Sequence, residues 1–404
     1  MTEAPRTSFE PSQLATAADP YRCLSEARIG GPVQRSTGAW IVFAHAAAEQ
    51  VLRSSAGRSG FIAELYRSIL PPGAAREELS HRINFLDPPD HPRVRQLVSK
   101  AFTPRRIAGL RPFVAELSRD ILGRFVAAGE LDLYADLAHQ VPALVISELL
   151  GVPTEDRDRL TKLSDDVAKL LGLGDMTEER LRVGVAAAEE MHAYLRSLLD
   201  ERRAEPQDDL LSALLVAEED QQRLSESELL SLAATLYSAG HRTTSDLFTN
   251  GTAALLAAPD VLASVRRGSL PMDAVIWEYL RFETPTHYVA RQLIEPLVVG
   301  DLTIPAGEPI LVMLAAANRD PDAYDEPDRF DPERWQRSPA PPAPLSFAFG
   351  PHYCLGANLA RLEAEEMLTA LLEVMPDVRP ATRDLRWRHT GLFRGLEEYR
   401  VVCR

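Results

Sequence analysis

One cysteine of this chain stands where its sulfur could serve as a metal ligand or a nucleophile. Cys354 lies in SFAFGPHYCLGANLARLE, residues 346–363, directly before a stretch whose apolar spacing predicts a helix. Unpaired backbone N–H groups and the positive end of the helix dipole would stabilise a negatively charged sulfur there. Gly350 and Gly356 bracket the cysteine and allow the backbone to turn tightly or approach a large flat group. A lone buried cysteine is more often structural, so the neighbouring residues decide.

The residues around Cys354 keep a fixed spacing. Phe347, Gly350, Cys354 and Gly356 form the pattern FxxGxxxCxG, and His352 stands two residues before the cysteine. This pattern resembles the haem-binding loop of the cytochrome P-450 family in its bacterial form. The resemblance implies that Cys354 is the axial thiolate ligand of a haem iron, with Phe347 placed to cover the sulfur. Thiolate ligation pushes electron density onto the iron and favours cleavage of an O–O bond.

A pair of opposite charges supports the same resemblance. Glu278 and Arg281 in WEYLRFETP stand three residues apart, on one face of a predicted helix. Taken alone, they would be a solvated ion pair that contributes little to stability. The resemblance implies instead that they are the family's ExxR pair. In that case they interlock with Arg334, from FDPERW, and brace the cysteine loop.

Basic side chains in three segments are candidates for holding the haem propionates. His91 and Arg95 in FLDPPDHPRVRQLVSKAFTP lie one turn apart on a helix predicted to begin near Pro92. Taken alone, they would be polar surface residues. The resemblance implies charge-assisted contacts to the propionates from both, from Arg291 in VARQLIEPLVV and from His352.

The stretch SAGHRTTSD, residues 238–246, places a glycine inside a long apolar helical run, where glycine costs about 1 kcal/mol relative to alanine. It resembles the family's kinked central helix over the oxygen-binding face of the haem, usually Ala-Gly-x-acid-Thr. Ala239 and Gly240 match, and the resemblance implies that they leave room for oxygen. Thr243 matches the alcohol that supports oxygen activation. Arg242 stands where the acid is expected, and an arginine stays charged and cannot relay protons near neutral pH.

Three interpretations of Arg242 remain open. In the first, Arg242 points away and pairs with Asp246 at i+4, while Thr243 and water carry protons. In the second, its guanidinium binds the carboxylate of an anionic substrate, and hydrogen peroxide can replace oxygen and the reductase. In the third, the haem chemistry is unusual and His241 acts as an acid or base, since an unperturbed imidazole titrates at about pH 6.5.

Substrate contacts are expected from three segments that surround the pocket in this family: its roof, the residues after the ExxR helix, and a C-terminal turn. The same side chains would also suit ordinary core packing. Together they predict a sizeable pocket of mixed polarity. The candidates are Phe61, Ile62, Leu65, Tyr66, His287, Tyr288, Val289 and Phe393.

The overall composition predicts an ordinary soluble globular protein. The chain has 404 residues, of which 45% are hydrophobic and 25% charged, and a net charge of −15. This charge argues against binding to nucleic acid or to anionic membranes. Three widely spaced cysteines make neither a disulfide framework nor a CxxC zinc site. The N-terminus lacks a signal-peptide pattern, and no apolar run approaches the roughly 20 residues of a membrane span, so we expect a cytoplasmic location.

One region departs from the acidic average. Arg93, Lys100, Arg105 and Arg106 make the segment after Pro92 locally basic. Such a group is either a solvated surface or a docking patch for an acidic electron donor such as a ferredoxin, whose association it would accelerate.

The hydrophobic pattern predicts a mainly α chain with a smaller β part. Helical periodicity extends with breaks over residues 92–282, and 357–375 form an amphipathic helix. Strands are expected within 38–45 and as a turn-linked pair within 301–314. The resemblance implies the cytochrome P-450 fold, a triangular helical domain around haem with small β-sheets. Residues 1–20 are predicted to be a flexible arm, and 21–404 a single haem-thiolate oxygenase domain.

Three functions follow as hypotheses. The first is a monooxygenase that contains haem b and hydroxylates or epoxidises an organic molecule, with a secondary metabolite as the expected substrate class. It would use O2 and NAD(P)H-derived electrons delivered by ferredoxin reductase and ferredoxin. The second is a peroxide-driven or otherwise atypical haem-thiolate enzyme that binds an anionic substrate through Arg242. The third is a non-catalytic haem-bearing binding protein, against which the retained Thr243 argues.

Overall fold

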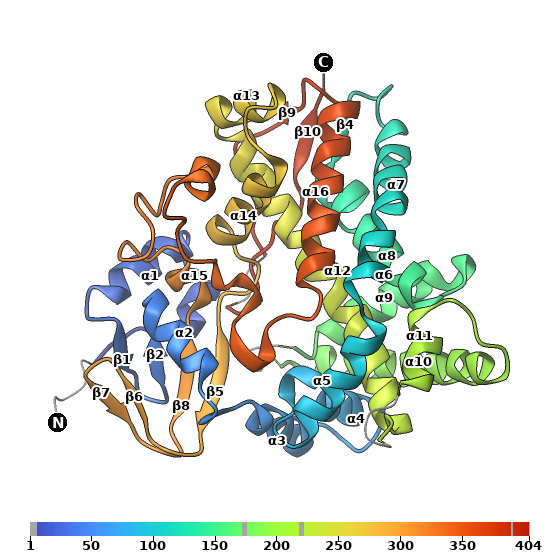
Figure 1. Ribbon diagram of the computed structural model, residues 1–404, viewed down its shortest axis with the longest axis vertical. Coiled ribbons are helices and arrows are strands. Elements are labelled where there is room, and N and C mark those ends of the chain that lie inside the picture. Colours follow the sequence, from blue (N-terminus) through green and yellow to red (C-terminus); the bar gives the residue numbers. More distant parts are fainter. Residues whose placement is uncertain (1–5, 172–175, 218–221, 389–390, 404) are drawn as a thin grey trace. The chain divides into compact units, whose positions relative to one another are not determined.

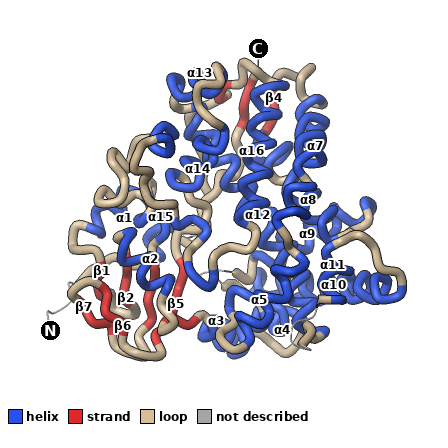
Figure 2. Tube along the Cα trace, in the orientation of Figure 1, coloured by secondary structure: helices blue, strands red, loops and turns tan. Residues whose placement is uncertain are grey.

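The structure is a computed structural model that describes residues 6–171, 176–217, 222–388 and 391–403. Its residues group into two compact units. We call residues 1–58, 114–139 and 243–404 the sheet unit, and residues 59–113 and 140–242 the helical unit. Figure 1 labels the elements along the chain, and Figure 2 separates them into helices, strands and loops. The predicted mainly α composition with small sheets is confirmed. A single domain over 21–404 stays a prediction.

The described residues of the sheet unit form three small sheets. Five strands lie in the order β1-β2-β8-β5-β3, three in the order β4-β10-β9, and two form the pair β6-β7. Strands β2 and β8 pair in parallel, whereas β1-β2, β5-β8 and β3-β5 are antiparallel. The bounds are β1 (Val33–Arg35), β2 (Trp40–Val42), β3 (Gly57–Arg58), β4 (Glu130–Asp132), β5 (Val289–Leu293), β6 (Leu297–Val299), β7 (Leu302–Ile304), β8 (Pro309–Val312), β9 (Arg379–Pro380) and β10 (Arg400–Val402).

Strand β2 is covered on both faces, which explains its wholly apolar sequence. Successive side chains of a strand point to opposite faces. Trp40 and Val42 accordingly join one buried cluster with Val312 of β8. Ile41 joins a second buried cluster, together with Phe43. A shift of one residue in the pairing would exchange the two sets, so both cores fix the register.

The helices of the sheet unit are short except for those that support the candidate site. The helices that support the site are the end of α12 (Glu226–Leu256), whose first part belongs to the helical unit, and α16 (Ala357–Val374). The others are η1 (Pro11–Ala15), α1 (Pro20–Arg28), α2 (His45–Arg53), α7 (Arg111–Gly123), η3 (Leu133–Ala138), α13 (Pro259–Arg266), α14 (Met272–Phe282), α15 (Leu314–Ala317), η6 (Pro332–Gln336), η7 (Leu345–Phe347) and η8 (Gly350–His352).

The helical unit contains no strand among its described residues. Several of its helices begin with a side-chain cap, since the hydroxyl of Thr103 accepts from the Arg106 N–H and the carboxylate of Asp209 from the Ser212 N–H. Its elements are α3 (Gly60–Ile69), α4 (Ala74–His81), η2 (Ile83–Phe85), α5 (Asp90–Ala101), α6 (Pro104–Gly109), α8 (Gln140–Leu150), η4 (Thr154–Asp156), α9 (Arg157–Ala168), α10 (Glu178–Ala204), α11 (Leu210–Val216) and the first part of α12.

The N-terminal segment is more firmly held than a flexible arm. Within its described part, from residue 6 onward, Phe9 and Leu14 are buried in the second cluster of the sheet unit. The Phe9 and Phe43 rings meet edge to face with centroids 5.6 Å apart. Two apolar anchors therefore fasten this segment, although its polar and proline-bearing sequence predicts little order.

Candidate active site

The cysteine loop is a sequence of two short helices that leads into α16. Its backbone is fixed by hydrogen bonds from the Cys354 N–H to the Phe347 carbonyl, 2.9 Å, and from the Tyr353 N–H to the Gly350 carbonyl, 3.0 Å. Gly350 has φ +71°, and a Cβ there would lie 2.5 Å from the carbonyl oxygen of Leu52. Glycine is therefore required at this position by both conformation and close approach.

The side chain of Cys354 is exposed at the end of this loop. A free cysteine is among the residue types most often buried, so its exposure is unusual. Gly356 follows it, and a Cβ there would meet only the Cys354 sulfur, at 4.0 Å, among the described atoms. The loop thus presents a sulfur and a bare backbone side by side, close to the first turn of α16.

Aromatic rings lie beside the sulfur. Phe347 and Tyr353 meet edge to face with centroids 6.2 Å apart. Burial raises the pKa of Tyr353, the charge of Cys354 raises it further, and Arg361 opposes the rise. The Tyr353 hydroxyl accordingly stays neutral next to the sulfur at physiological pH.

The structure brings Glu278, Arg281 and Arg334 together in the sheet unit. All three are buried, with at most 1% of each residue exposed. The Arg281 guanidinium donates two hydrogen bonds to the Glu278 carboxylate, at 2.7 and 2.9 Å. Arg334 Nε donates to the same carboxylate at 3.2 Å. This is the interlocked arrangement expected of a brace, and it differs from a solvated ion pair because every partner is desolvated.

Two further residues, which the sequence did not single out, connect the brace to the cysteine loop. The Arg281 guanidinium donates to the Asn318 carbonyl at 3.0 Å. The Asn318 side chain accepts from the Leu345 N–H, 2.7 Å, and donates to the Ser346 hydroxyl, 2.7 Å. Asn and Ser carry no distinctive spacing signal in this sequence, so only the fold reveals this link.

The candidate propionate ligands fall into both units. Arg291 on β5 and His352 on η8 belong to the sheet unit, where Arg291 is buried and donates to the Ala290 carbonyl at 2.7 Å. His91 is buried and Arg95 half-buried on α5 of the helical unit. The i, i+4 spacing places these two on one helical face. Their assignment to haem stays a prediction.

Helix α12 is an uninterrupted α-helix through the whole SAGHRTTSD stretch. Ala239 is exposed, whereas a Cβ on Gly240 would lie 3.2 Å from the Ile146 side chain of α8. Glycine therefore also suits a close packing of α12 against α8, in addition to the room for oxygen that the resemblance implies. Thr243 is half-buried on the same helix.

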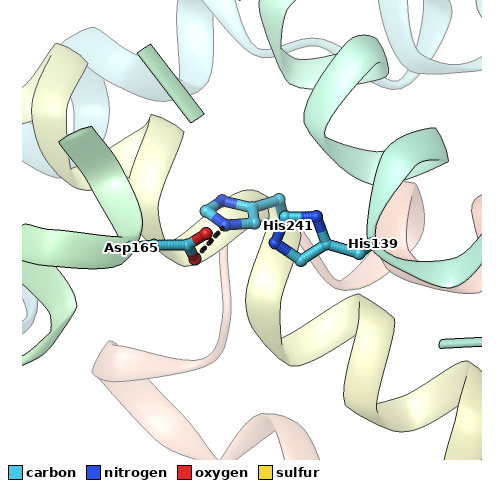
Figure 3. Close-up of side chains that lie close together, drawn as sticks. All are labelled: His139, Asp165 and His241. Carbon is cyan, nitrogen blue, oxygen red and sulfur yellow. Dashed lines mark hydrogen bonds and ion pairs between the residues drawn. The ribbon is translucent and has the colours of Figure 1, made fainter. Parts of the chain in front are cut away.

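His241 is held by the helical unit itself. It is 1% exposed, and its Nε2 lies 3.2 Å from Asp165 Oδ1 of α9 (Figure 3). Its Nδ1 lies 3.2 Å from the Tyr237 carbonyl one turn earlier. Both ring nitrogens thus have partners in the protein, so a structural role explains why a histidine is buried at this position.

Arg242 is half-buried, and its Nε is buried without a hydrogen-bond partner. No ion pair joins it to another residue in the described part of the chain. Asp246, the partner expected at i+4, is buried and forms an ion pair with Arg388. The i+4 spacing predicts a pair between Arg242 and Asp246. Asp246 pairs instead with Arg388 of the C-terminal segment.

The candidate substrate residues are dispersed. His287 and Phe393 line one cavity of about 330 Å³ in the sheet unit. Tyr288 and Val289 instead pack against the two buried clusters around β2. On α3, Tyr66 is 2% exposed and donates from its hydroxyl to the Leu170 carbonyl at 3.1 Å. The remaining α3 residues are half-buried or exposed, namely Phe61, Ile62 and Leu65.

The basic segment around α5 and α6 is partly neutralised. Arg93 forms ion pairs with Asp90 and Glu228, and Arg106 pairs with Asp208 at 3.2 Å. Its local positive charge is smaller than the segment alone indicates. Asp90 directly precedes the segment, and Asp208 and Glu228 come from distant parts of the chain. Within the described ranges, no helix is both long enough and apolar enough to cross a membrane.

Comparisons with known proteins agree with the motif. The family model for cytochrome P-450 matches residues 67–375. The chain is 42% identical over 333 residues to cytochrome P-450 107B1 of Saccharopolyspora erythraea, covering 82% of this chain and 79% of that one. It is 39% identical over 323 residues to mycinamicin IV hydroxylase/epoxidase of Micromonospora griseorubida, covering 78% of each. The crystal structure of CalO2 matches with a TM-score of 0.91 at 31% identity, covering 98% of this chain and 99% of that one.

Proposed function

This chain belongs to the cytochrome P-450 family of haem-thiolate monooxygenases, and from that premise we propose that Cys354 holds the haem of an enzyme that hydroxylates or epoxidises an organic secondary metabolite. The oxidant is O2, with electrons from NAD(P)H through a ferredoxin reductase and a ferredoxin. The named activity of the mycinamicin relative supports both the reaction type and the substrate class.

The residues present fit a haem. The observation that carries the proposal is the exposed sulfur of Cys354. Its loop has a conformation that requires glycine at position 350. Gly356 follows the cysteine and leaves the backbone there without a covering side chain. Arg291 and His352 offer basic groups in the same unit for the propionate carboxylates. When bound, the haem supplies the activation of O2 for insertion of one oxygen atom into the substrate.

The chain's own residues have separable tasks. The first turn of α16 stabilises negative charge on the Cys354 sulfur, and the brace around Glu278 fixes the loop through Asn318. Thr243 offers a hydroxyl that can hold and pass a proton, a role that Arg242 cannot take because its guanidinium does not titrate. His91 and Arg95 remain candidates for contacts to the propionates, as the resemblance implies.

The test is the optical spectrum of the reduced protein with carbon monoxide. A thiolate-ligated haem absorbs at about 450 nm in this state, and loss of the thiolate moves the band to about 420 nm. We expect the band near 450 nm in the wild type and its loss in Cys354→Ser. Cys23→Ser is the matched control, since Cys23 is a half-buried cysteine on α1, and should leave the band unchanged. A wild-type band at 420 nm in folded protein would contradict the proposal.

A second candidate function rests on Arg242. Its buried and unpartnered Nε, with no ion pair among the described residues, leaves a guanidinium available to a carboxylate of the substrate. In that case hydrogen peroxide supplies both the oxygen atom and the oxidising equivalents. The non-catalytic alternative is not retained, because the relatives named above are enzymes of this family.

Matched ligands separate the two candidates. We would titrate the ferric protein with dodecanoate and dodecanamide and compare Arg242→Ala with the wild type. An anion clamp predicts that only dodecanoate perturbs the haem spectrum and that the variant binds it more weakly by about 10- to 150-fold, the range of one charged hydrogen bond. Equal responses to both ligands in both proteins would leave the oxygen-dependent enzyme as the function.

A further inference from the structure

Two polar contacts, one turn apart, join α9 to α12 inside the helical unit. In the first, the Tyr237 hydroxyl lies 2.9 Å from Thr161 Oγ1. Four residues further along each helix, His241 Nε2 lies 3.2 Å from Asp165 Oδ1 (Figure 3). The equal i, i+4 spacing on both helices shows that α9 and α12 run side by side here. The separation of the imidazole and the carboxylate is therefore fixed by helix packing.

The position of the ring hydrogen on His241 follows from its other nitrogen. Nδ1 lies 3.2 Å from the Tyr237 carbonyl oxygen, and a carbonyl can only accept. A neutral ring accordingly carries its hydrogen on Nδ1 and turns the lone pair of Nε2 toward the Asp165 carboxylate. An ionised carboxylate also offers only lone pairs. The contact therefore requires a positive charge between the two groups, which is either a second proton on the ring or a metal ion.

The distance between the two groups favours the metal ion. A hydrogen bond from a charged imidazole to a carboxylate is usually about 2.7–2.9 Å long. The separation of His241 Nε2 and Asp165 Oδ1 is longer, at 3.2 Å. Two ligands that each lie about 2.0–2.1 Å from a tetrahedral zinc ion are about 3.3 Å apart. The observed separation is thus closer to the edge of a coordination shell than to a charge-assisted hydrogen bond.

The surroundings of the pair also suit a metal. Histidines that bind metals usually donate their other ring N–H to a carbonyl or carboxylate, which fixes the tautomer and the ring orientation, and the Tyr237 carbonyl is placed to do this. His241 is 1% exposed, whereas the side chain of Asp165 is 38% exposed. Water can therefore reach the pair from the Asp165 side and fill the positions that two protein ligands leave open.

We propose that His241 Nε2 and the Asp165 carboxylate bind a divalent transition metal, zinc by preference, and that the ion ties α9 to α12. An imidazole nitrogen and a carboxylate oxygen are ligands that zinc accepts, and zinc imposes no geometry through its d-electrons. An ion that binds only the folded chain stabilises it. The site uses neither Cys354 nor a haem, so it goes beyond the proposed function and does not depend on it.

The test is isothermal titration of the haem-loaded, EDTA-treated protein with zinc chloride. We expect the wild type to bind zinc, and His241→Gln and Asp165→Asn each to weaken this binding by at least about 10-fold, the smaller loss found when only an outer partner of a metal ligand is removed. Zinc should also raise the melting temperature of the wild type but not that of Asp165→Asn.

Two matched variants serve as controls. His81 Nδ1 on α4 also lies against the carbonyl four residues earlier, that of Glu77, at 2.8 Å, but His81 forms no ion pair with a carboxylate among the described residues. Asp166 is the next residue of α9 and pairs with Lys169. His81→Gln and Asp166→Asn should therefore bind zinc as the wild type does. Asp165 is half-buried, so Asp165→Asn keeps the test decisive even if His241→Gln does not fold.

Zinc K-edge absorption spectra of the same samples identify the ligands. We expect nitrogen and oxygen at about 2.0–2.1 Å, whereas sulfur at about 2.3 Å would place the ion on a cysteine and overturn the proposal. No zinc binding by the wild type, unchanged affinity in His241→Gln and Asp165→Asn, or an equal loss in the two controls would also overturn it. The carbon monoxide band, recorded separately, reports the haem-thiolate assignment, so either result can fail without the other.

Discussion

Glu278 on α14 and Glu363 on α16 are almost wholly buried in the sheet unit, and their surroundings differ. Glu278 is wholly buried and accepts from Arg281, Arg334, the Trp335 indole and the Asp331 N–H. Glu363 is 1% exposed and forms no ion pair among the described residues; its carboxyl group meets the Thr244 hydroxyl.

The difference lies in the partners that burial leaves to each carboxyl group. Burial raises the pKa of Glu363 well above its usual value, and the nearby Thr244 hydroxyl opposes the rise only in part. This carboxyl is therefore stored in its neutral form. Two guanidiniums and two N–H donors surround Glu278, so the brace holds its shape by charge-assisted hydrogen bonds.

The largest effect is expected when the charge at the brace is removed. Glu278→Gln leaves Arg281 and Arg334 buried without a counter-ion, which should destabilise the protein by about 3–5 kcal/mol. The measurement is the urea midpoint, together with haem content after expression. Glu26→Gln is the control, because Glu26 pairs with Arg22 at an exposed site, where such pairs contribute about 0–1 kcal/mol. A loss at Glu278 no larger than at Glu26 would show that pairing does not hold the brace.

The brace and the cysteine loop could be predicted from sequence because each has a fixed spacing. ExxR and FxxGxxxCxG fix residue types at set intervals along one short segment, and the fold places these residues as a family member should. The register of the sheets also follows from alternation, as at Trp40, Ile41 and Val42, whose side chains divide between two cores.

The rest could not be predicted, because it depends on contacts between distant segments. The i+4 spacing predicts that Asp246 pairs with Arg242 one turn away, yet Arg388 from the C-terminal segment binds it. The cavity lined by His287 has walls from residues 14–20, 385–388 and 393–397, which share no pattern. Glu363 lies in a run of glutamates on an amphipathic helix, where a charged residue predicts a solvated face.

A smaller effect is expected when the charge of the brace is kept and its geometry changed. Arg334→Lys preserves a cation for Glu278 but loses the donors to the Asp325 and Glu326 carbonyls. We expect about 1–3 kcal/mol of destabilisation, measured by the same urea midpoint. Arg329→Lys is the control, since that side chain is 65% exposed in its pair with Glu326. Equal midpoints for the two variants would show that charge alone, without the fork of the guanidinium, sustains the brace.

The smallest effect has the opposite sign and concerns Glu363. In the unfolded chain this carboxyl ionises near its ordinary pKa of 4.5, whereas burial keeps it protonated in the folded protein. As pH rises above that value, the unfolded state loses a proton that the folded state retains, so stability falls until the folded carboxyl also ionises.

Glu363→Gln cannot ionise and escapes this loss. Its melting temperature should exceed that of the wild type by on the order of 1–2 °C at pH 7.5, with a smaller difference at pH 5. Glu373→Gln is the control, because Glu373 lies on the same helix in an exposed pair with Arg119. The difference between its melting temperature and that of the wild type should be the same at pH 5 and pH 7.5. If Glu363→Gln destabilises the protein at both pH values, the carboxyl is ionised and paired like Glu278, and the contrast between the two glutamates is lost.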